Sequence, residues 1–419
     1  MKSSSRRRLV AALSALAAGA AVAFAVGAGS GAQATGRADW VGTWATGPAG
    51  AGAGSSALGF TDQSVRMPVR VSVGGEAIRF RLNATFSTQN VTLGHATVAV
   101  PETDTPELTD VEATSVRELT FNGGDASVLI PKGGQVLTDP LWMHVPARAD
   151  LVITLYFPVA TGPATWHLTA RTQTFVGAGD HAADPAGTAF TITRTAFYFL
   201  TAIDVLSHRS DGSVAIIGDS ITDGTNSSLN GQARWPDRLA ERLLARPGPK
   251  DPGILNLGMA GNAVTHDGSE INFPELGLNG LARLHRDAFS QTGVETVIVF
   301  LGINDIQIHN DPADRIIDGL RQLVAQIKQR DLSVVICTLM PFEGFTSWTP
   351  EKEVTRLAVN DFIRSNRFLF HAVIDFDETM KDPAAPSKLR AEWDSGDHIH
   401  PNNAGYQAMA DSVRLSILN

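Results

Sequence analysis

Ser220, near the middle of the chain, has the setting of a catalytic nucleophile. It closes the sequence Gly218-Asp219-Ser220, which directly follows a short apolar run over residues 214–217. A serine hydroxyl attacks an acyl carbonyl only when a general base takes its proton, and a histidine held by a carboxylate is such a base. His400, with Asp397 three residues before it, offers that base and its orienting group from a single turn.

Acyl transfer also needs fixed donors for the oxyanion that develops on the reacting carbonyl, and each donor lowers the barrier by about 3 kcal/mol. The candidates are the backbone N–H groups of Ser220 and Gly261 and the side-chain amide of Asn304. A glycine at position 261 allows the backbone to approach the carbonyl closely. Asp219 is expected to hydrogen-bond its own turn and to position Asn304 or neighbouring loops, and Asp305 is expected to be structural.

Two alternatives concern the C-terminal segment. His398 competes with His400 for the role of base, but the Asp-x-x-His spacing favours His400 and leaves His398 exposed or supporting. Asp394, Asp397, His398 and His400 are also residue types that bind divalent metals. The sequence has no His-Glu-x-x-His signature of an open metal site, so we expect no metal.

The segments that carry these residues follow a regular alternation of strands and helices. Helical patterns separate the apolar runs, and this alternation predicts a doubly wound parallel sheet of the flavodoxin-like kind over residues 211–419. In such a sheet, ligands bind beyond the carboxyl ends of the strands, where the polar segments that contain Ser220, Gly261, Asn304 and His400 would converge. The predicted strands cover residues 214–217, 254–257, 296–301, 334–338 and 372–374.

Residues 35–206 show a period of two instead, with turn residues roughly every ten positions. This pattern predicts a jelly-roll-like antiparallel β-sandwich. It also predicts a β-hairpin with its turn at Gly74-Gly75. The aromatic side chains of this half either form a carbohydrate-binding face or, as the commoner case, lie in the core. They are Trp40, Trp44, Trp142, Trp166 and His167.

The first 34 residues are predicted to be an export signal. Lys2 and Arg6-Arg7-Arg8 precede an apolar stretch, and Ala32-Gln33-Ala34 is a small-residue cleavage site, so we expect a secreted protein cut after Ala34. No later apolar run is long enough to span a membrane. The net charge of −9 argues against a nucleic-acid partner. The single cysteine, Cys337, rules out an internal disulfide.

Taken in order, Gly-Asp-Ser, the glycine after the second strand, Gly-x-Asn-Asp and Asp-x-x-His resemble the four sequence blocks of the SGNH/GDSL hydrolases. The resemblance covers residues 211–419 and is strongest to a bacterial subgroup of arylesterases and acylhydrolases, several of them linked to plant polysaccharide breakdown. The segments shared with that subgroup are Arg234-Trp-Pro-Asp237, Gly302-Ile-Asn-Asp-Ile306, Pro341-Phe-Glu-Gly344 and Asp394-Ser-Gly-Asp-His-Ile-His-Pro401.

This resemblance implies a three-layer α/β fold in which Ser220 attacks the acyl carbonyl, His400 is the general base and Asp397 orients it. It implies that Gly261 and Asn304 complete the oxyanion hole, and that neither metal nor organic cofactor is needed. Nothing in the resemblance extends to the first half of the chain.

These motifs do not specify the substrate. A short-chain carboxylic ester, aryl or polysaccharide-bound, is expected because no long apolar lid segment is present. The alternatives are a lipase or phospholipase acting on lipid esters, an acyltransferase with a carbohydrate acceptor, and a non-catalytic carbohydrate-binding protein.

Overall fold

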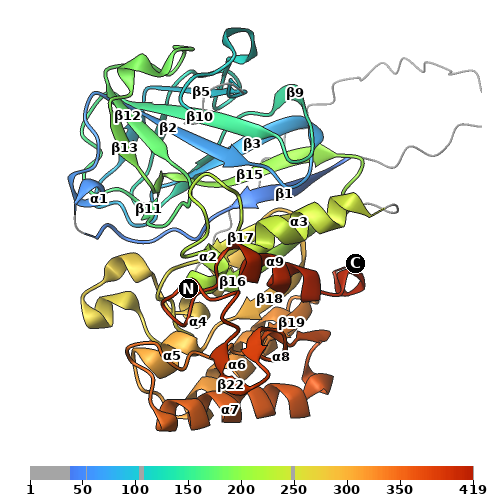
Figure 1. Ribbon diagram of the computed structural model, residues 1–419. Helices are drawn as coiled ribbons and strands as arrows, with labels where there is room; N and C mark the ends of the chain where they lie inside the picture. The colour runs from blue at the N-terminus through green and yellow to red at the C-terminus, as the bar shows by residue number, and fades with distance from the viewer. Residues whose placement is uncertain (1–37, 53, 103–107, 247–250, 419) are drawn as a thin grey trace, which may run out of the picture. The chain divides into compact units, whose positions relative to one another are not determined.

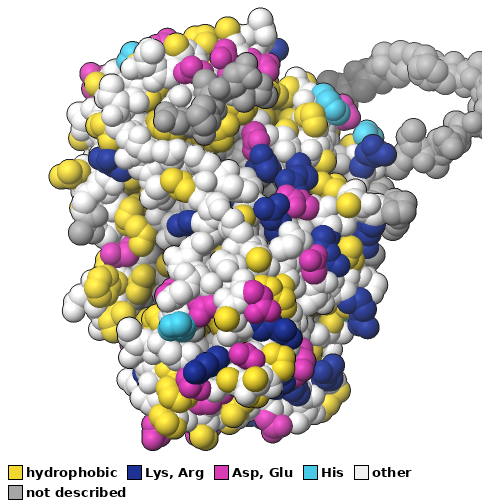
Figure 2. All heavy atoms as spheres, in the orientation of Figure 1, with side chains coloured by type: hydrophobic (Ala, Val, Ile, Leu, Met, Phe, Trp, Pro, Cys, Tyr) yellow, Lys and Arg dark blue, Asp and Glu magenta, His cyan; other side chains and the backbone are white. Residues whose placement is uncertain are grey.

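The computed structural model describes residues 38–52, 54–102, 108–246 and 251–418, and these form one compact unit. The predicted export signal lies outside the described residues. No helix within the described ranges is long and apolar enough to cross a membrane. Acidic and basic side chains are interspersed over the face drawn in Figure 2.

The second part of the chain is built on a five-stranded parallel sheet in the order β17-β16-β18-β19-β20 (Figure 1). This is the 2-1-3-4-5 order of flavodoxin-like folds, as predicted. The strands are apolar along most of their length because both faces of the sheet are covered. Their bounds are β16 Ser213–Gly218, β17 Gly253–Gly258, β18 Val294–Phe300, β19 Ser333–Cys337 and β20 Ala372–Ile374.

Helices cover this sheet in two groups. Helix α3 packs against α9, and α6 packs against α7, with the sheet between the two pairs (Figure 1). Each helix places apolar side chains in a common core at helical spacing. The long helices are α3 Trp235–Ala245, α6 Ala313–Lys328, α7 Pro350–Ser365 and α9 Asn403–Ser412. The short ones are α2 Ser220–Asp223, α4 Gly280–Leu284, α5 Ile303–Gln307 and α8 Phe376–Met380. A further short helix, α1 Ser55–Leu58, belongs to the first part of the chain (Figure 1).

The first part of the chain is antiparallel and consists mainly of two sheets, with strand orders β1-β15-β3-β8 and β13-β12-β2-β10-β5-β6; β9 also pairs with β3. Apolar side chains from both sheets share one core, as in a sandwich. The jelly-roll connectivity and the predicted domain boundary stay predictions.

The strands of these two sheets are β1 Asp39–Ala45, β2 Gln63–Arg70, β3 Gly75–Asn83, β5 His95–Ala99, β6 Arg117–Glu118, β8 Gln135–Leu137, β9 Leu141–Val145, β10 Asp150–Phe157, β12 Thr174–Ala178, β13 Ile192–Arg194 and β15 Leu200–Ser207. Three two-stranded pairs complete the described strands: β4 Val91–Leu93 with β7 Val128–Ile130, β11 Trp166–His167 with β14 Phe197–Tyr198, and β21 Lys381–Asp382 with β22 Ala385–Leu389.

The predicted hairpin at Gly74-Gly75 is wrong. Strand β2 belongs to the six-stranded sheet and β3 to the other one, so the chain crosses between sheets at this point. The hydroxyl of Ser72, within the crossing, donates to the Thr43 carbonyl at 2.6 Å. A Cβ at Gly74 would lie 2.2 Å from the Val145 carbonyl oxygen. The glycine therefore serves a close backbone approach, which the alternating pattern alone cannot distinguish from a turn.

The two parts meet along β1, which lies against β17. The Gly42 N–H donates to the Thr292 carbonyl at 2.9 Å, and the Ser213 hydroxyl donates to the Gly42 carbonyl at 3.0 Å. A Cβ at Gly253 would lie only 1.9 Å from the Gly42 carbonyl oxygen. The backbones of the two parts are therefore in direct contact along this line.

Candidate active site

Ser220 is the first residue of α2, immediately beyond the carboxyl end of β16. Asp219 precedes the helix and its carboxylate accepts the Ile221 N–H at 2.9 Å. Because the first N–H groups of a helix have no intrahelical acceptor, the Ser220 N–H is available to a ligand. A Cβ at Gly218 would lie 2.2 Å from the Thr222 hydroxyl oxygen, so this tight strand-to-helix turn requires a glycine.

The loop before α9 brings His400 onto Ser220. The Nε2 atom of His400 lies 2.8 Å from the Ser220 Oγ, and its Nδ1 lies 2.6 Å from the Asp397 Oδ2. The Nδ1–H donates to the carboxylate, which leaves Nε2 to accept the serine proton. Nucleophile, base and orienting carboxylate are thus within hydrogen-bond reach of one another.

Asp397 is held as an anion by its surroundings. Its partial burial acts to raise its pKa, but the hydrogen bonds from the His400 side chain and from the backbone N–H groups of His400 and Ile399 outweigh burial and hold the pKa well below its usual range. The Asn226 side-chain amide donates a further hydrogen bond to Asp397 Oδ2 at 2.9 Å. The carboxylate that orients the imidazole is therefore charged at any pH at which an esterase works.

Gly261 occupies a tight turn that follows β17. The Asn262 N–H donates to the Met259 carbonyl at 3.1 Å, and Gly261 has a φ of 72°. A positive φ at this position is typical of a type II turn and favours glycine. The turn packs against α2, since a Cβ at Gly258 would lie 2.3 Å from the Asp223 nitrogen.

Asn304, in α5, points its amide at the same turn. Its Nδ2 donates to the Asn262 carbonyl at 2.9 Å, and its Oδ1 accepts from Gln307 Nε2 at 2.8 Å. Gln307 thereby fixes which end of the amide carries the N–H groups. One of the two N–H bonds on Nδ2 is used by Asn262, and among the described residues the other has no acceptor and is available to an oxyanion.

The two supporting aspartates act on different loops. Asp305 accepts the N–H groups of Val264 and Thr265 at 2.8 and 3.1 Å, so it fastens the chain just after the Gly261 turn. Among the described residues no hydrogen bond joins Asp219 to Asn304, and the Asp219 Oδ2 has no partner. Burial raises the pKa of Asp219 to about 7.

His398 does not reach Ser220 in a hydrogen bond but pairs with Asp394, whose carboxylate lies 2.6 Å from its Nδ1. Its ring is half exposed and covers Gly344, where a Cβ would lie 2.9 Å from the ring atoms. The structure therefore gives each of the two histidines a separate aspartate.

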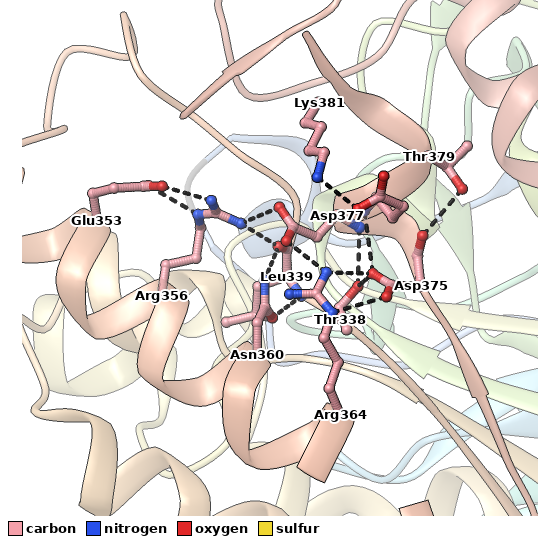
Figure 3. Close-up of polar contacts among 11 residues, drawn as sticks. Thr338, Leu339, Glu353, Arg356, Asn360, Arg364, Asp375, Asp377, Thr379 and Lys381 are labelled. Atoms are coloured by element: carbon pink, nitrogen blue, oxygen red, sulfur yellow. Dashed lines mark hydrogen bonds and ion pairs between the residues drawn. The ribbon is translucent and has the colours of Figure 1, made fainter. Parts of the chain in front are cut away.

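A buried polar network fastens the segment after β19, which leads to the Gly344 turn (Figure 3). The Asn360 side chain accepts the Leu339 N–H at 2.7 Å and donates to the Leu339 carbonyl at 2.8 Å, while Arg356 donates to the same carbonyl at 2.8 Å. Arg356 also bridges Glu353 and Asp377. Farther along this segment, the Ser347 hydroxyl donates to Gln307 Oε1 at 3.1 Å, so the network indirectly supports Asn304.

Three residues of the site were not predicted from the sequence: Asn226, Gln307 and Arg283. Arg283, from α4, is completely buried and donates to the Gly218 carbonyl, the Leu257 carbonyl and the Asn262 side chain at 2.8, 2.7 and 2.9 Å. It ties together the ends of β16 and β17 behind the serine. An arginine in an amphipathic segment is usually exposed, so the sequence offered no signal for this role.

The predicted aromatic set of the first part does not form one exposed face. Trp44, Trp166 and His167 are buried, whereas Trp142 is 73% exposed. Trp40 lies under the guanidinium of Arg79 at 4.4 Å. The core interpretation holds for the three buried residues.

An α/β hydrolase fold with serine, histidine and aspartate assembled at the carboxyl edge of its parallel sheet defines the class of this protein. Residues 216–408 match the GDSL-like Lipase/Acylhydrolase family. The α/β part of the chain is thus similar to the SGNH/GDSL hydrolases, and this similarity supports an ester hydrolase of that type.

The chain is 25% identical over 204 residues to a GDSL lipase of Mycobacterium tuberculosis, covering 48% of this chain and 79% of that protein. Among solved structures, a hydrolase from the metagenome of Lake Arreo is 20% identical with a TM-score of 0.38, covering 50% of this chain and 97% of that one. A GDSL-like lipase from Bacteroides thetaiotaomicron is 16% identical with a TM-score of 0.35, covering 49% and 87%.

Proposed function

We propose that this protein is a secreted serine esterase that hydrolyses short-chain carboxylic esters through an acyl-enzyme. The observation that carries the proposal is the 2.8 Å contact between His400 Nε2 and Ser220 Oγ, backed by Asp397 on the other ring nitrogen. Among the described residues these three side chains have the order of contacts that nucleophilic catalysis by serine needs.

In the proposed reaction, His400 takes the Ser220 proton as Oγ attacks the acyl carbonyl. The Ser220 and Gly261 N–H groups and the free N–H of Asn304 stabilise the oxyanion. His400 then gives the proton to the leaving alcohol, and a water activated by the same imidazole releases the acid. Asp397 stabilises the imidazolium in both steps without itself taking the proton.

A small acyl group is supported by the packing around the Gly261 turn. A Cβ at Gly261 would lie 2.7 Å from the Leu276 side chain, so Leu276 lies directly against this turn. The loop after β19 offers little extra room, because Phe342 is buried and Phe345 and Trp348 pack on the α/β core. We take this packing as support for a short acyl chain.

A polar alcohol such as a sugar is supported by the loop that follows α2. Asn226 reaches Ser395 and Asp397, while Asn403 accepts the Ser228 N–H at 2.9 Å. Asn230 in turn contacts Gln173 of the first part at 2.7 Å. These amide and hydroxyl groups make the loop that contacts Asp397 polar rather than apolar. We therefore include an acetylated polysaccharide among the proposed substrates.

The test is acyl release from p-nitrophenyl acetate, p-nitrophenyl palmitate and acetylated xylan by the wild type and Ser220→Ala. We expect acetate release that is lost in the variant by at least about a thousandfold. Preference for palmitate would replace the short-chain proposal with a lipase, and faster transfer to added alcohols than to water would indicate an acyltransferase. Unchanged turnover by Ser220→Ala would refute the assignment of the nucleophile.

Export is proposed from the sequence of residues 1–34. N-terminal sequencing of the protein recovered from culture medium should begin at Thr35. Recovery of the full-length chain only inside the cells would contradict this part of the proposal.

A further inference from the structure

His167, in the first part of the chain, is buried against the α/β part and lies between two acceptors. Its Nδ1 is 2.9 Å from the Gly47 carbonyl oxygen and its Nε2 is 2.9 Å from Asp223 Oδ1. Both the histidine and the aspartate are at most 4% exposed. Because a carbonyl and a carboxylate both accept, both ring nitrogens donate, and the ring is an imidazolium facing a carboxylate.

The other oxygen of Asp223 accepts a hydrogen bond from the turn that contains Gly261. Asp223 Oδ2 accepts the N–H of Ala260 at 3.1 Å, and Ala260 directly precedes Gly261. Asp223 is the last residue of α2, the helix that begins with Ser220. One carboxylate therefore fixes the distance between the nucleophile's helix and the peptide next to the proposed oxyanion donor.

The first part of the chain also contacts this turn through apolar side chains. Met259 belongs to the hydrophobic core of the first part, although it follows a strand of the parallel sheet. A Cβ at Gly47 would lie 2.8 Å from Met259 Cγ, so the chain after β1 lies directly on the turn. The Phe197 ring is stacked beside the His167 ring, with the centroids 6.4 Å apart.

We propose that His167 is a positioning residue for the esterase reaction, acting through Asp223 and Ala260 on the Gly261 N–H. The first part of the chain is then a component of the catalytic site, not an appendage to it. The inference rests on the proposed function, since it takes Gly261 as an oxyanion donor. Without the imidazolium, Asp223 Oδ1 loses the hydrogen bond that it has among the described residues, and the carboxylate is less firmly oriented toward the Ala260 N–H.

The charges around the ring agree with this arrangement. Burial acts to lower the pKa of His167, but the Asp223 carboxylate and the Gly47 carbonyl outweigh burial and raise the pKa above its usual value, against an opposing contribution from Arg234. This direction agrees with the imidazolium that the two acceptors around the ring indicate.

The test compares His167→Leu, which donates no hydrogen bond, with His167→Gln, whose amide can still donate to Asp223. For each we would measure kcat and KM on p-nitrophenyl acetate, the fraction of reactive serine by fluorophosphonate titration, and Ki for an aryl boronic acid. Bound boronate carries the tetrahedral anionic oxygen of the transition state. Kinetic constants are expressed per reactive serine and measured well below the unfolding temperature.

We expect His167→Leu to lower kcat about 10- to 100-fold with KM within twofold, and to raise the boronate Ki by a similar factor. His167→Gln should recover part of both losses. A merely structural role for His167 would reduce the count of reactive serine but leave kcat and Ki per site unchanged, and that result would overturn the proposal.

His181→Gln is the matched control. His181 also bonds one carboxylate and one backbone carbonyl, Asp184 and Ala178, but contacts only the first part of the chain. It should leave kcat, KM and Ki unchanged. Ser220→Ala separates the two hypotheses: if that variant keeps its turnover, the proposed function fails, whereas an inactive Ser220→Ala beside an unaffected His167→Leu refutes this inference alone.

Discussion

The His400 Nε2 atom and the Ser220 Oγ lie 2.8 Å apart although 180 residues separate them along the chain. The contact exists because two loops end at the same edge of the parallel sheet, and each is fastened by polar side chains. The contribution of each of these hydrogen bonds to catalysis can be measured with a separate substitution.

Asn226→Ala should weaken the orientation of Asp397. The amide donates to Asp397 Oδ2 and Ser395 Oγ, both at 2.9 Å, and a hydrogen bond to a charged group is worth about 1.5–3 kcal/mol. We expect kcat to fall about tenfold or more with KM little changed, measured on p-nitrophenyl acetate. Asn366→Ala, which removes an amide bonded to the Phe362 carbonyl at a helix end, serves as the control. Equal activity of the two variants would show that Asn226 does not support catalysis.

Gln307→Glu should impair the oxyanion site while keeping the shape of the side chain. A glutamate accepts the Ser347 hydroxyl as the glutamine does, but it cannot donate to Asn304 Oδ1. Only the bond to the Asn262 carbonyl then holds the Asn304 amide, and a carboxylate beside Oδ1 favours the flipped amide, so we expect kcat to fall about tenfold and the boronate Ki to rise in parallel. Ser347→Ala, which removes only the outer hydrogen bond, should have a smaller effect. The reverse order would contradict the relay from Ser347 to Asn304.

Asp219→Asn should change how stability depends on pH. Burial raises the pKa of Asp219 to about 7, with Asp305 adding to the rise, while the Ile221 N–H and Arg283 oppose it. The folded state therefore holds a proton that the unfolded chain releases near pH 4, so wild-type stability falls as the pH rises from about 4 to 7. The asparagine has no proton to lose and keeps the Oδ1 acceptor for Ile221.

Relative to the wild type, Asp219→Asn should thus gain unfolding free energy across that window, up to about 4 kcal/mol above pH 7. Urea unfolding at pH 4.5 and pH 8 measures this difference. A gap between the two proteins that does not change with pH would show that Asp219 is ionised in the folded state throughout.

Much of the α/β part could be predicted because its determinants are local. Each parallel strand is one contiguous apolar run, and the residues that end the strands are the ones that meet at the sheet edge, as Ser220 and Asn304 do. The pairing of His400 with Asp397 is also local, since both lie on one turn.

The sequence did not reveal the polar contacts between residues that lie far apart along the chain. Gln307 is recognisable only once Asn304 and Ser347 are known to flank it, and His167 acquires its partner Asp223 from 56 residues away. The alternation on either side of Gly74 is the same for paired strands and for strands of different sheets, so periodicity could not reveal the crossing. Neither helical spacing nor charge distinguishes the buried Arg283 from a surface arginine.

Strand β17 is an outer strand of the parallel sheet, yet its backbone is not left open. The Ser72 hydroxyl takes the outward N–H of Ile254 at 2.9 Å, and β1 lies along the same side. An uncovered strand edge is a template for pairing with further chains. We therefore expect that a chain begun at residue 211 would present that edge to its neighbours and form β-rich aggregates.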